Sequence, residues 1–213
     1  MREHSTLDHF LSHTESGIRA MFSMLGMGPN ASSDDHVLME DGLQARDKKV
    51  SARLMRVNHA GEVAAQGLYH GQAYTARDEK VKQHMQDCAR EEQAHLDWCK
   101  KRLTELNDRP SALAPAWYLG SYAIGATVGL LGDQWSLGFV SETEKQVVRH
   151  LDKHLSRLPE NDKKSQEILQ RIRDDEARHD ANAQDAGVHE IPKFARHLMQ
   201  ATSKVMTKTA YWA

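Results

Sequence analysis

Apolar residues recur at intervals of three and four positions along most of this chain, which is the repeat of an α-helix. From about Lys49 onward, this repeat is interrupted only by short segments containing Pro, Gly, Asn or Asp. The pattern predicts successive helices, which span about 49–75, 81–106, 139–158, 163–186 and 193–213. We therefore expect an all-α fold in which the first four of these helices form two antiparallel hairpins.

The N-terminal part of the chain has a different character. Residues 1–27 carry a further amphipathic repeat, and the segment GMGPNASSDD that follows has the composition of a flexible linker. The sequence thus divides into an N-terminal helix with its linker, over 1–45, and a main domain over 46–213. Because the chain does not start with a basic segment followed by an apolar one, no signal peptide is expected.

Ionisable residues interrupt the apolar face of three predicted helices. The second helix places Glu92 and His95 on its inward face. The third helix places Glu144 there, and the fourth places Glu176 and His179 there. Burying such groups costs several kcal/mol each unless they are paired or bind a metal ion. The pattern therefore indicates that something in the core compensates these charges.

The spacing around the turns relates the two predicted hairpins to each other. Glu62 and Glu92 are equally far from the break at Arg77–Asp78, and Glu144 and Glu176 are equally far from the middle of the next hairpin. Residues equidistant from the turn of an antiparallel hairpin face each other at the same height. Each hairpin therefore places a single Glu opposite a Glu-x-x-His pair.

A Glu-x-x-His match alone is weak evidence, but two such half-sites in register predict a shared metal centre. Carboxylate oxygens with one imidazole per ion suit iron or manganese, and the absence of thiolate ligands argues against a structural zinc site. This donor set is typical of ferritin-like four-helix bundles that bind two metal ions. The predicted ligands are Glu62, Glu92, His95, Glu144, Glu176 and His179.

Four other polar residues lie near the predicted ligands in the sequence. Glu91 and Asp175 each precede a ligand, and the helical repeat turns them toward solvent. The second hairpin has no residue that corresponds to His59 of the first, so we expect a structural or supporting role for His59. His150 is off the face of Glu144 and is a candidate for a hydrogen bond to a ligand carboxylate.

The net charge and the cysteine content bear on the possible partners and on the location of the protein. The formal net charge of −2 provides no basic field, so a nucleic-acid partner is not expected. The two cysteines, Cys88 and Cys99, are three turns apart on one predicted helix, too far apart to form a disulfide there. We expect both to be reduced and buried, in keeping with an intracellular location.

An uncharged, largely apolar segment over 110–132 connects the two hairpins. Prolines and glycines dilute it, and no basic cluster flanks it, so a membrane span is disfavoured. One interpretation is that the segment is a connector packed on the bundle. We favour another, in which an insertion over about 110–138 contains an additional apolar helix that lies at the bilayer interface. Ser121, Gly125 and Gly129 form a row of small residues that permits close helix packing. A lipophilic substrate entering from the bilayer would fit this arrangement.

Several of these segments together resemble one known family. LMRVNHAGEVAAQGLYHGQA, EEQAHLDWCKKRL, LGDQWSLGFVSETEKQV and DDEARHD look like segments of the bacterial demethoxyubiquinone hydroxylases, which are di-iron monooxygenases of ubiquinone biosynthesis. The resemblance runs from about Ser51 to the C-terminus, and the family's metal ligands fall on the six residues named above. It implies two Fe ions, O2-dependent hydroxylation of a demethoxy-polyprenyl benzoquinone or quinol ring, and peripheral attachment to the cytoplasmic face of the inner cell membrane.

Some alternatives stay open at the level of sequence. A ferritin-like iron-storage or ferroxidase protein would share the ligands, and a non-catalytic scaffold of a quinone-biosynthesis complex would share the bundle. The glycine-containing segments lack the strand–turn–helix setting of a nucleotide-binding loop. Electrons would therefore come from NADH bound in another way, from the quinol itself, or from a partner such as a reductase or another ubiquinone-biosynthesis protein. A homo-oligomer is also left open.

Overall fold

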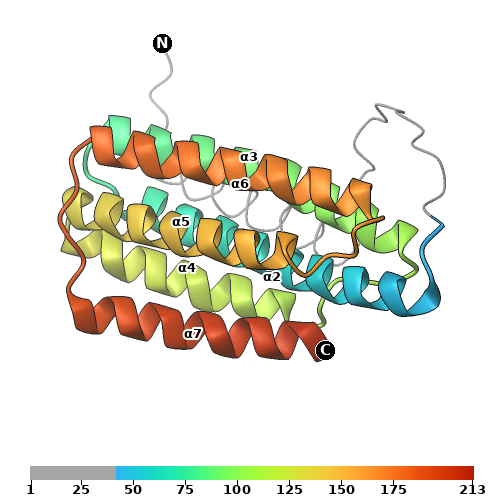
Figure 1. The fold of residues 1–213 in the computed structure, drawn as a ribbon. Coiled ribbons are helices and arrows are strands. Elements are labelled where there is room, and N and C mark those ends of the chain that lie inside the picture. The colour runs from blue at the N-terminus through green and yellow to red at the C-terminus, as the bar shows by residue number, and fades with distance from the viewer. Residues whose placement is uncertain (1–41) are drawn as a thin grey trace, which may run out of the picture. The chain divides into compact units, whose positions relative to one another are not determined.

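The computed structural model describes residues 42–213, and the predicted helix over 1–27 and most of its linker lie outside them. The described residues form six helices and no strand (Figure 1), which confirms the all-α prediction. The helices are α2 (Ala45–Thr75), α3 (Glu79–Glu105), α4 (Ala114–Leu131), α5 (Asp133–Leu155), α6 (Lys163–Asp185) and α7 (Lys193–Trp212).

Four of these helices form the predicted bundle of two antiparallel hairpins. One hairpin is α2–α3 and the other is α5–α6, with α4 in the crossover between them. Two large apolar clusters lie in the core of the bundle. The first contains Leu54, Cys99, Leu151 and Ile172, and the second contains Tyr69, Met85, Cys88, Leu137 and Val140. Since Glu62 lies between Leu54 and Tyr69 on α2, the polar residues of interest occupy the middle of the bundle, with an apolar cluster on each side.

Hydrogen bonds to the turns hold the two hairpins together at both ends. At one end, the carboxylate of Asp133 accepts the backbone N–H groups of Arg77 and Asp78 at 3.0 and 2.8 Å. At the other end, the buried guanidinium of Arg102 on α3 donates to Asp162, the N-cap of α6, at 2.6 Å. These charge-assisted contacts fix the register of one hairpin against the other.

The third bundle helix is longer than the sequence pattern predicts. It begins at Asp133 rather than at about Phe139, so the insertion predicted over about 110–138 ends with α4 at Leu131. Gly132 alone separates α4 from α5, and its positive φ of 123° gives the sharp change of direction. Helix α5 starts at Asp133, and the negative charge of this residue in the first turn is favourable at the positive end of the helix dipole.

Helix α4 packs against α2 through glycines on both helices. A Cβ atom at Gly71 would lie 2.2 Å from the Tyr122 carbonyl oxygen, and one at Gly125 would lie 2.2 Å from the Leu68 carbonyl oxygen. The predicted close approach at Gly125 is therefore observed, and Gly129 likewise contacts the end of α2. This close packing fixes the position of α4 against α2.

Replacing Gly125 with alanine should destabilise the protein by about 2 kcal/mol, because the new methyl group would overlap backbone atoms that cannot move independently. The matched control is Gly120→Ala on the same helix. A Cβ atom there meets nothing within 4 Å, and the change should stabilise by about 0.5–1 kcal/mol. Urea unfolding of both variants measures the difference. Equal stabilities would contradict the described packing of α4.

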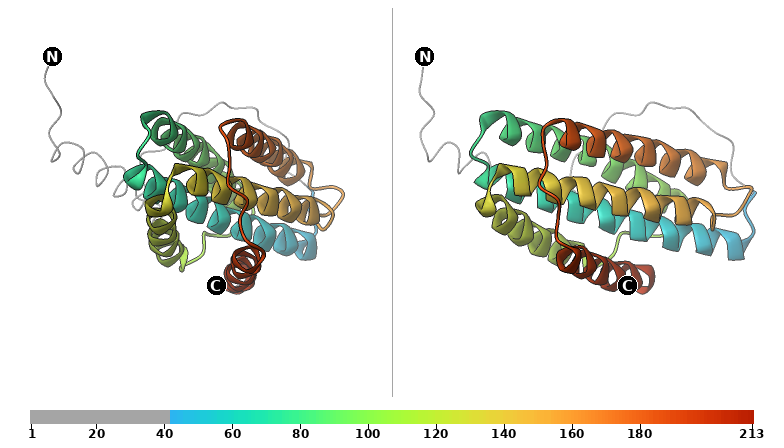
Figure 2. Two further views of the ribbon diagram at one scale, coloured as in Figure 1. Left: turned by 90° about the vertical axis from the view of Figure 1, so that its left-hand side faces the viewer. Right: turned by 60° about the vertical axis from the view of Figure 1, so that its left-hand side comes forward.

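Helix α7 lies outside the four-helix bundle, along α2, on the same side as α4 (Figure 2). Only Ala210 is fully buried along α7, and the helix end is held by Arg53, whose guanidinium carbon lies 4.1 Å from the centre of the Trp212 ring. Within residues 42–213, no helix combines the length and apolarity that crossing a membrane requires.

Candidate metal centre

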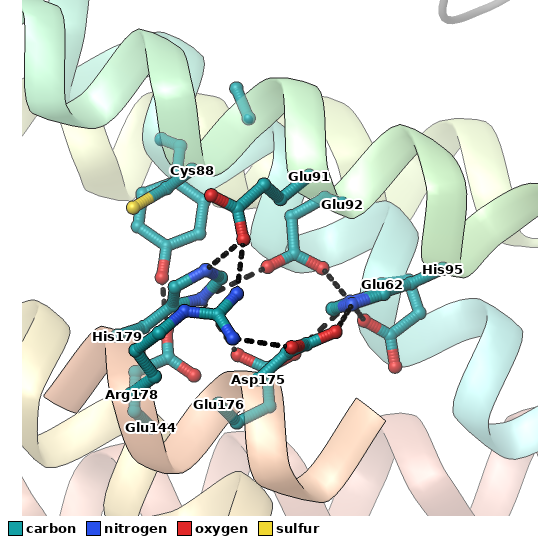
Figure 3. A network of polar contacts seen from close by, with 12 residues as sticks. Glu62, Cys88, Glu91, Glu92, His95, Glu144, Asp175, Glu176, Arg178 and His179 are labelled. Carbon is teal, nitrogen blue, oxygen red and sulfur yellow. Dashed lines mark hydrogen bonds and ion pairs between the residues drawn. The ribbon is translucent and has the colours of Figure 1, made fainter. Parts of the chain in front are cut away.

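The six predicted ligands converge in the middle of the bundle, as Figure 3 shows. Every one of these residues is buried, with at most 3% of its surface exposed. They come from all four bundle helices, and they are Glu62 on α2, Glu92 and His95 on α3, Glu144 on α5, and Glu176 and His179 on α6.

Carboxylate oxygens surround the Nδ1 atom of each histidine. His95 Nδ1 lies 3.2 Å from Glu92 Oε2 and 3.3 Å from Glu176 Oε1. Glu62 Oε2 is 3.6 Å from the same nitrogen. His179 Nδ1 lies 3.1 Å from Glu176 Oε2 and 3.8 Å from Glu92 Oε1. Glu92 and Glu176 therefore each turn one oxygen toward each histidine.

These side chains form two overlapping sets of donor atoms. One set comprises Glu62, Glu92, His95 and Glu176, and the other comprises Glu144, Glu176 and His179. Within each set, the donor atoms all lie within 4.8 Å of one another. Because Glu176 belongs to both sets, the two sets are neighbouring parts of one buried cluster whose donor atoms suit a metal centre.

The buried carboxylates of the cluster favour positive charge beside them. Burial raises the pKa of Glu92 and of Glu144 well above the usual value, and the charge of Glu176 adds to both shifts. Although burial opposes it, hydrogen bonding to Glu176 and the other carboxylates raises the pKa of His95. In addition, Glu92 Oε1 is buried without a hydrogen-bond partner. Two divalent cations would offset four carboxylates, so the residues present fit a metal centre.

One contact to the cluster was not predicted from the sequence. The buried hydroxyl of Tyr69 donates a hydrogen bond to Glu144 Oε1. Tyr69 lies seven residues after Glu62, on the same face of α2, and this position was the available signal. The bond helps to hold the Glu144 carboxylate in place.

The prediction that Glu91 and Asp175 point to solvent is confirmed only in part, because Glu91 is exposed and Asp175 is half-buried, yet each carboxylate also contacts a histidine. Asp175 Oδ2 lies 3.2 Å from His95 Nε2, and Glu91 Oε2 lies 3.1 Å from His179 Nε2. Each carboxylate reaches across to the histidine of the facing helix, because α3 and α6 are in contact at this height. A helical repeat describes one helix at a time and cannot reveal such a contact.

These crossed contacts prepare the histidines for metal binding. A carboxylate that accepts the Nε2–H proton leaves Nδ1 unprotonated and directed at the cluster. Arg178 links the two carboxylates by donating to Asp175 Oδ1 at 2.6 Å and to Glu91 Oε2 at 2.7 Å (Figure 3). The network therefore fixes the orientation of both imidazoles from outside the cluster.

Replacing Asp175 with asparagine should weaken metal binding by about 10–100-fold, because the amide no longer fixes the His95 ring as a metal ligand. Competition with a chromogenic chelator measures the affinity. The neighbouring Asp174 is exposed and contacts Arg173, so Asp174→Asn is the matched control and should bind metal as the unaltered chain does. Equal affinities for the two variants would contradict the role assigned to Asp175.

Two other histidines near the cluster lie apart from the donor sets. His59 is buried, and burial lowers its pKa to about 4. His150 contacts the ring of His154 at 3.9 Å between centroids, and burial lowers the His150 pKa to about 4. His154 Nδ1 in turn lies 3.1 Å from Asn58 Oδ1. Among the described hydrogen bonds, His150 makes none to a predicted ligand, so its predicted contact with a ligand carboxylate is not observed.

A cavity of about 360 Å³ connects the cluster with the side of the bundle that carries α4 and α7. Glu62, Glu144 and Glu176 reach it from the cluster. Ile124 and Leu198 line it and are also exposed, which places an opening between α4 and α7. Its walls are mostly apolar, and the lining residues include Val57, Ala65, Leu68, Phe139, Val147, Leu151 and Met206.

Comparison with known proteins gives one consistent family. The family model described as "Ubiquinone biosynthesis protein COQ7" matches residues 49–210. A protein of Nitrosococcus oceani named 3-demethoxyubiquinol 3-hydroxylase is 47% identical over 211 residues, covering 99% of this chain and 98% of the relative. A protein of the same name from Ralstonia pickettii is 55% identical over 169 residues, covering 79% of this chain and 78% of the relative.

Solved structures agree on the fold. A dodecameric thioferritin, the bacterioferritin-related protein of Bacteroides fragilis, aligns with a TM-score of 0.51 at 15% identity, covering 67% of this chain and 85% of that one. A two-domain protein of Anabaena variabilis with DJ-1-like and ferritin-like domains aligns with a TM-score of 0.58 at 17% identity, covering 80% of this chain and 50% of that one. These likenesses establish a ferritin-like bundle.

Proposed function

This chain belongs to the family of ubiquinone biosynthesis protein COQ7, and we propose that it is an O2-dependent monooxygenase that hydroxylates the ring of demethoxyubiquinol. The observation that carries the proposal is the apolar cavity, which leads from the surface to three carboxylates of the metal cluster. A lipophilic ring in this cavity would lie directly beside the metal centre. The substrates of the protein are accordingly O2 and a quinol.

Two iron ions are the proposed cofactor. Glu62, Glu92 and His95 would hold one ion, Glu144 and His179 would hold the other, and Glu176 belongs to both donor sets. When bound, the metal centre would supply the activation of O2, with one oxygen atom entering the substrate ring and the other leaving as water. The two electrons that this requires would come from the quinol itself or from a partner reductase. Carboxylate-rich donor sets with one imidazole per ion suit iron, and they also accept manganese, so the choice of metal is part of the proposal.

The protein's own residues bind the substrate and exclude water. Apolar side chains of α2, α5 and α7 form most of the cavity wall, which removes bulk water from the neighbourhood of the cluster. Tyr69 holds the Glu144 carboxylate on one side, and the carboxylates of Glu91 and Asp175 hold the histidines on the other. The geometry of the donor set is thus fixed before substrate enters.

The cavity also separates this function from the two alternatives. An iron-storage protein has no use for an apolar cavity that leads to its metal residues, because its substrate is a hydrated ion. A non-catalytic scaffold has no use for four buried carboxylates, which destabilise a fold that binds no metal. Both features are accounted for by oxidation of an apolar substrate at the metal centre.

The direct experiment is a single-turnover assay of the iron-loaded protein with a decyl-tailed demethoxyubiquinol and isotopically labelled O2. We expect one labelled oxygen atom in the product ring, detected by mass spectrometry. Protein loaded with manganese, which suits the same ligands, serves as the control for the metal. Consumption of O2 by the iron-loaded protein without a hydroxylated ring would contradict the proposed reaction and favour a ferroxidase.

We further propose that the side formed by α4 and α7 rests on the cytoplasmic face of the inner cell membrane. Helix α4 contains no charged residue, and it exposes Leu119 and Leu130 on one face. Helix α7 exposes a stripe at helical spacing that consists of Phe194, Leu198, Val205 and Trp212. The cavity opens between these two helices, so a substrate could enter from the bilayer.

Co-sedimentation with vesicles of phosphatidylethanolamine and phosphatidylglycerol tests this placement. The double variant Leu119→Glu with Leu130→Glu should lose most vesicle binding, because it places two charges on the apolar face of α4. Lys101→Glu, an exposed position on α3, provides a control for added negative charge. Unchanged binding of the double variant would show that another surface holds the protein at the membrane.

A further inference from the structure

Two hydrogen-bond donors in the cavity wall have no partner. Asn58 on α2 and Trp117 on α4 both line the cavity, and Asn58 Nδ2 and Trp117 Nε1 are buried without a hydrogen-bond partner. Among the described residues that line this cavity, no other buried side-chain nitrogen or oxygen lacks a partner. Burying an N–H group without an acceptor is unfavourable. Two such groups in the wall of one cavity therefore indicate a ligand that supplies hydrogen-bond acceptors.

Neighbouring side chains fix the orientation of both donors. Asn58 Oδ1 lies 3.1 Å from His154 Nδ1, so the amide oxygen is engaged and the amide nitrogen remains available. His154 is itself buried and contacts the ring of His150. The indole of Trp117 packs against the apolar cluster that includes Val57 on α2, which holds the ring in place. Both donors are therefore oriented in advance, which lowers the entropy cost of binding.

The position of the pair matches the chemistry of the proposed substrate. Asn58 precedes Glu62 by one helical turn on α2, and both residues line the cavity. The ring of a 1,4-quinone or quinol carries two oxygens at opposite positions, and each accepts a hydrogen bond in either redox state. A ring held at both oxygens cannot rotate freely, so one edge of it stays directed at the metal cluster.

We propose that Asn58 and Trp117 bind the two ring oxygens of the quinol or quinone and thereby select which ring carbon is hydroxylated. This inference rests on the proposed function and specifies how that site recognises its substrate. His154 acts as a positioning residue, because it contacts Asn58 and holds the amide with its nitrogen available. The apolar wall provides affinity for the ring, and the two donors provide its orientation.

Calorimetric titration of the iron-loaded full-length protein with two probes tests the inference. The first probe is a decyl-tailed methoxy-methyl-1,4-benzoquinone, and the second is decylbenzene, which has the tail and ring without oxygens. Asn58→Leu and Trp117→Phe should each weaken binding of the quinone by about tenfold, since each removes one hydrogen bond. Both variants should bind decylbenzene about as tightly as the unaltered chain does, because leucine and phenylalanine keep an apolar side chain at each position.

Thr207→Val is the matched control. Thr207 lines the cavity, but its hydroxyl already donates to the Lys204 carbonyl oxygen at 3.2 Å, so its loss should not change the affinity for the quinone. Asn58→Leu leaves His154 Nδ1 without its acceptor and could impair folding. Trp117→Phe keeps an aromatic ring and loses only the N–H group and part of the ring, so the test does not depend on Asn58→Leu alone.

The outcomes separate this inference from the proposed function. If both variants bind the quinone as tightly as the unaltered chain does, the inference is overturned and the hydroxylase assignment stays intact. Equal weakening of the quinone and of decylbenzene would also overturn it, since that result indicates a change in cavity shape. If the unaltered protein does not prefer the quinone to decylbenzene and forms no hydroxylated ring, the proposed function fails and the inference fails with it.

Discussion

Replacing Glu176 with glutamine should reduce hydroxylation by more than about a hundredfold and leave at most one metal ion per chain. Glu176 is the one residue that belongs to both sets of donor atoms, so its carboxylate would contact both ions. An amide keeps the shape of the side chain but removes its charge. Because even residues outside the ligand set change metal affinity by about 10–100-fold, the loss of a shared ligand should have a larger effect.

Metal content per chain and turnover of a decyl-tailed demethoxyubiquinol measure this result. Glu167 lies on the same helix but is exposed, so Glu167→Gln is a matched control that changes the net charge equally. It should retain two metal ions and full turnover. Two bound ions and unchanged turnover in Glu176→Gln would contradict the position assigned to the metal centre.

Removal of the metal ions should lower the unfolding temperature by about 10 °C or more. Without cations, four carboxylates remain buried close together, and their burial and mutual repulsion are uncompensated. Breaking a buried charge pair costs about 3–5 kcal/mol. A change of 1 kcal/mol shifts the unfolding temperature of a chain of this size by about 2–4 °C. Differential scanning calorimetry before and after chelation measures the shift at constant pH.

Glu92→Gln provides the matching variant for this experiment. It removes one of the four buried carboxylates and keeps the side-chain shape. It should lose most of the metal-dependent increase in unfolding temperature, because stabilisation by a ligand depends on its affinity for the folded state. If chelation left the unaltered protein equally stable, the buried carboxylates would have to be compensated by protons alone, and the metal centre would be in doubt.

The bundle and its six central residues could be predicted because two independent patterns coincide on them. Glu144 and Glu176 interrupt an apolar helical face, and they are also equally spaced about a turn. Either pattern alone occurs by chance. Together they specify both that a side chain is buried and which side chain it faces, and the structure places all six residues in one cluster.

Contacts between helices explain what sequence reasoning missed. The periodicity of α3 turns Glu91 away from the face of Glu92, yet α6 lies close enough for Glu91 to reach His179. The start of α5 at Asp133 was missed because a single glycine of positive φ is enough to separate two helices, so no longer break in the sequence marks the boundary.

The cavity is the feature least accessible to sequence reasoning. Its walls combine α2 with α4 and α7, which are distant in sequence, and their relative placement depends on glycine contacts such as that at Gly125. Asn58 and Trp117 have no periodic signal that marks them as donors. Their significance depends on the absence of a partner for each N–H group, which only a three-dimensional structure reveals.

Mössbauer spectroscopy of protein purified without oxygen and enriched in iron-57 tests the proposed metal centre most directly. Two adjacent ions that share a carboxylate should give about two iron ions per chain, and their oxidised form should show the spectrum of a magnetically coupled pair. A single zinc ion, or protein that binds no iron under these conditions, would contradict the metal centre and with it the proposed hydroxylation.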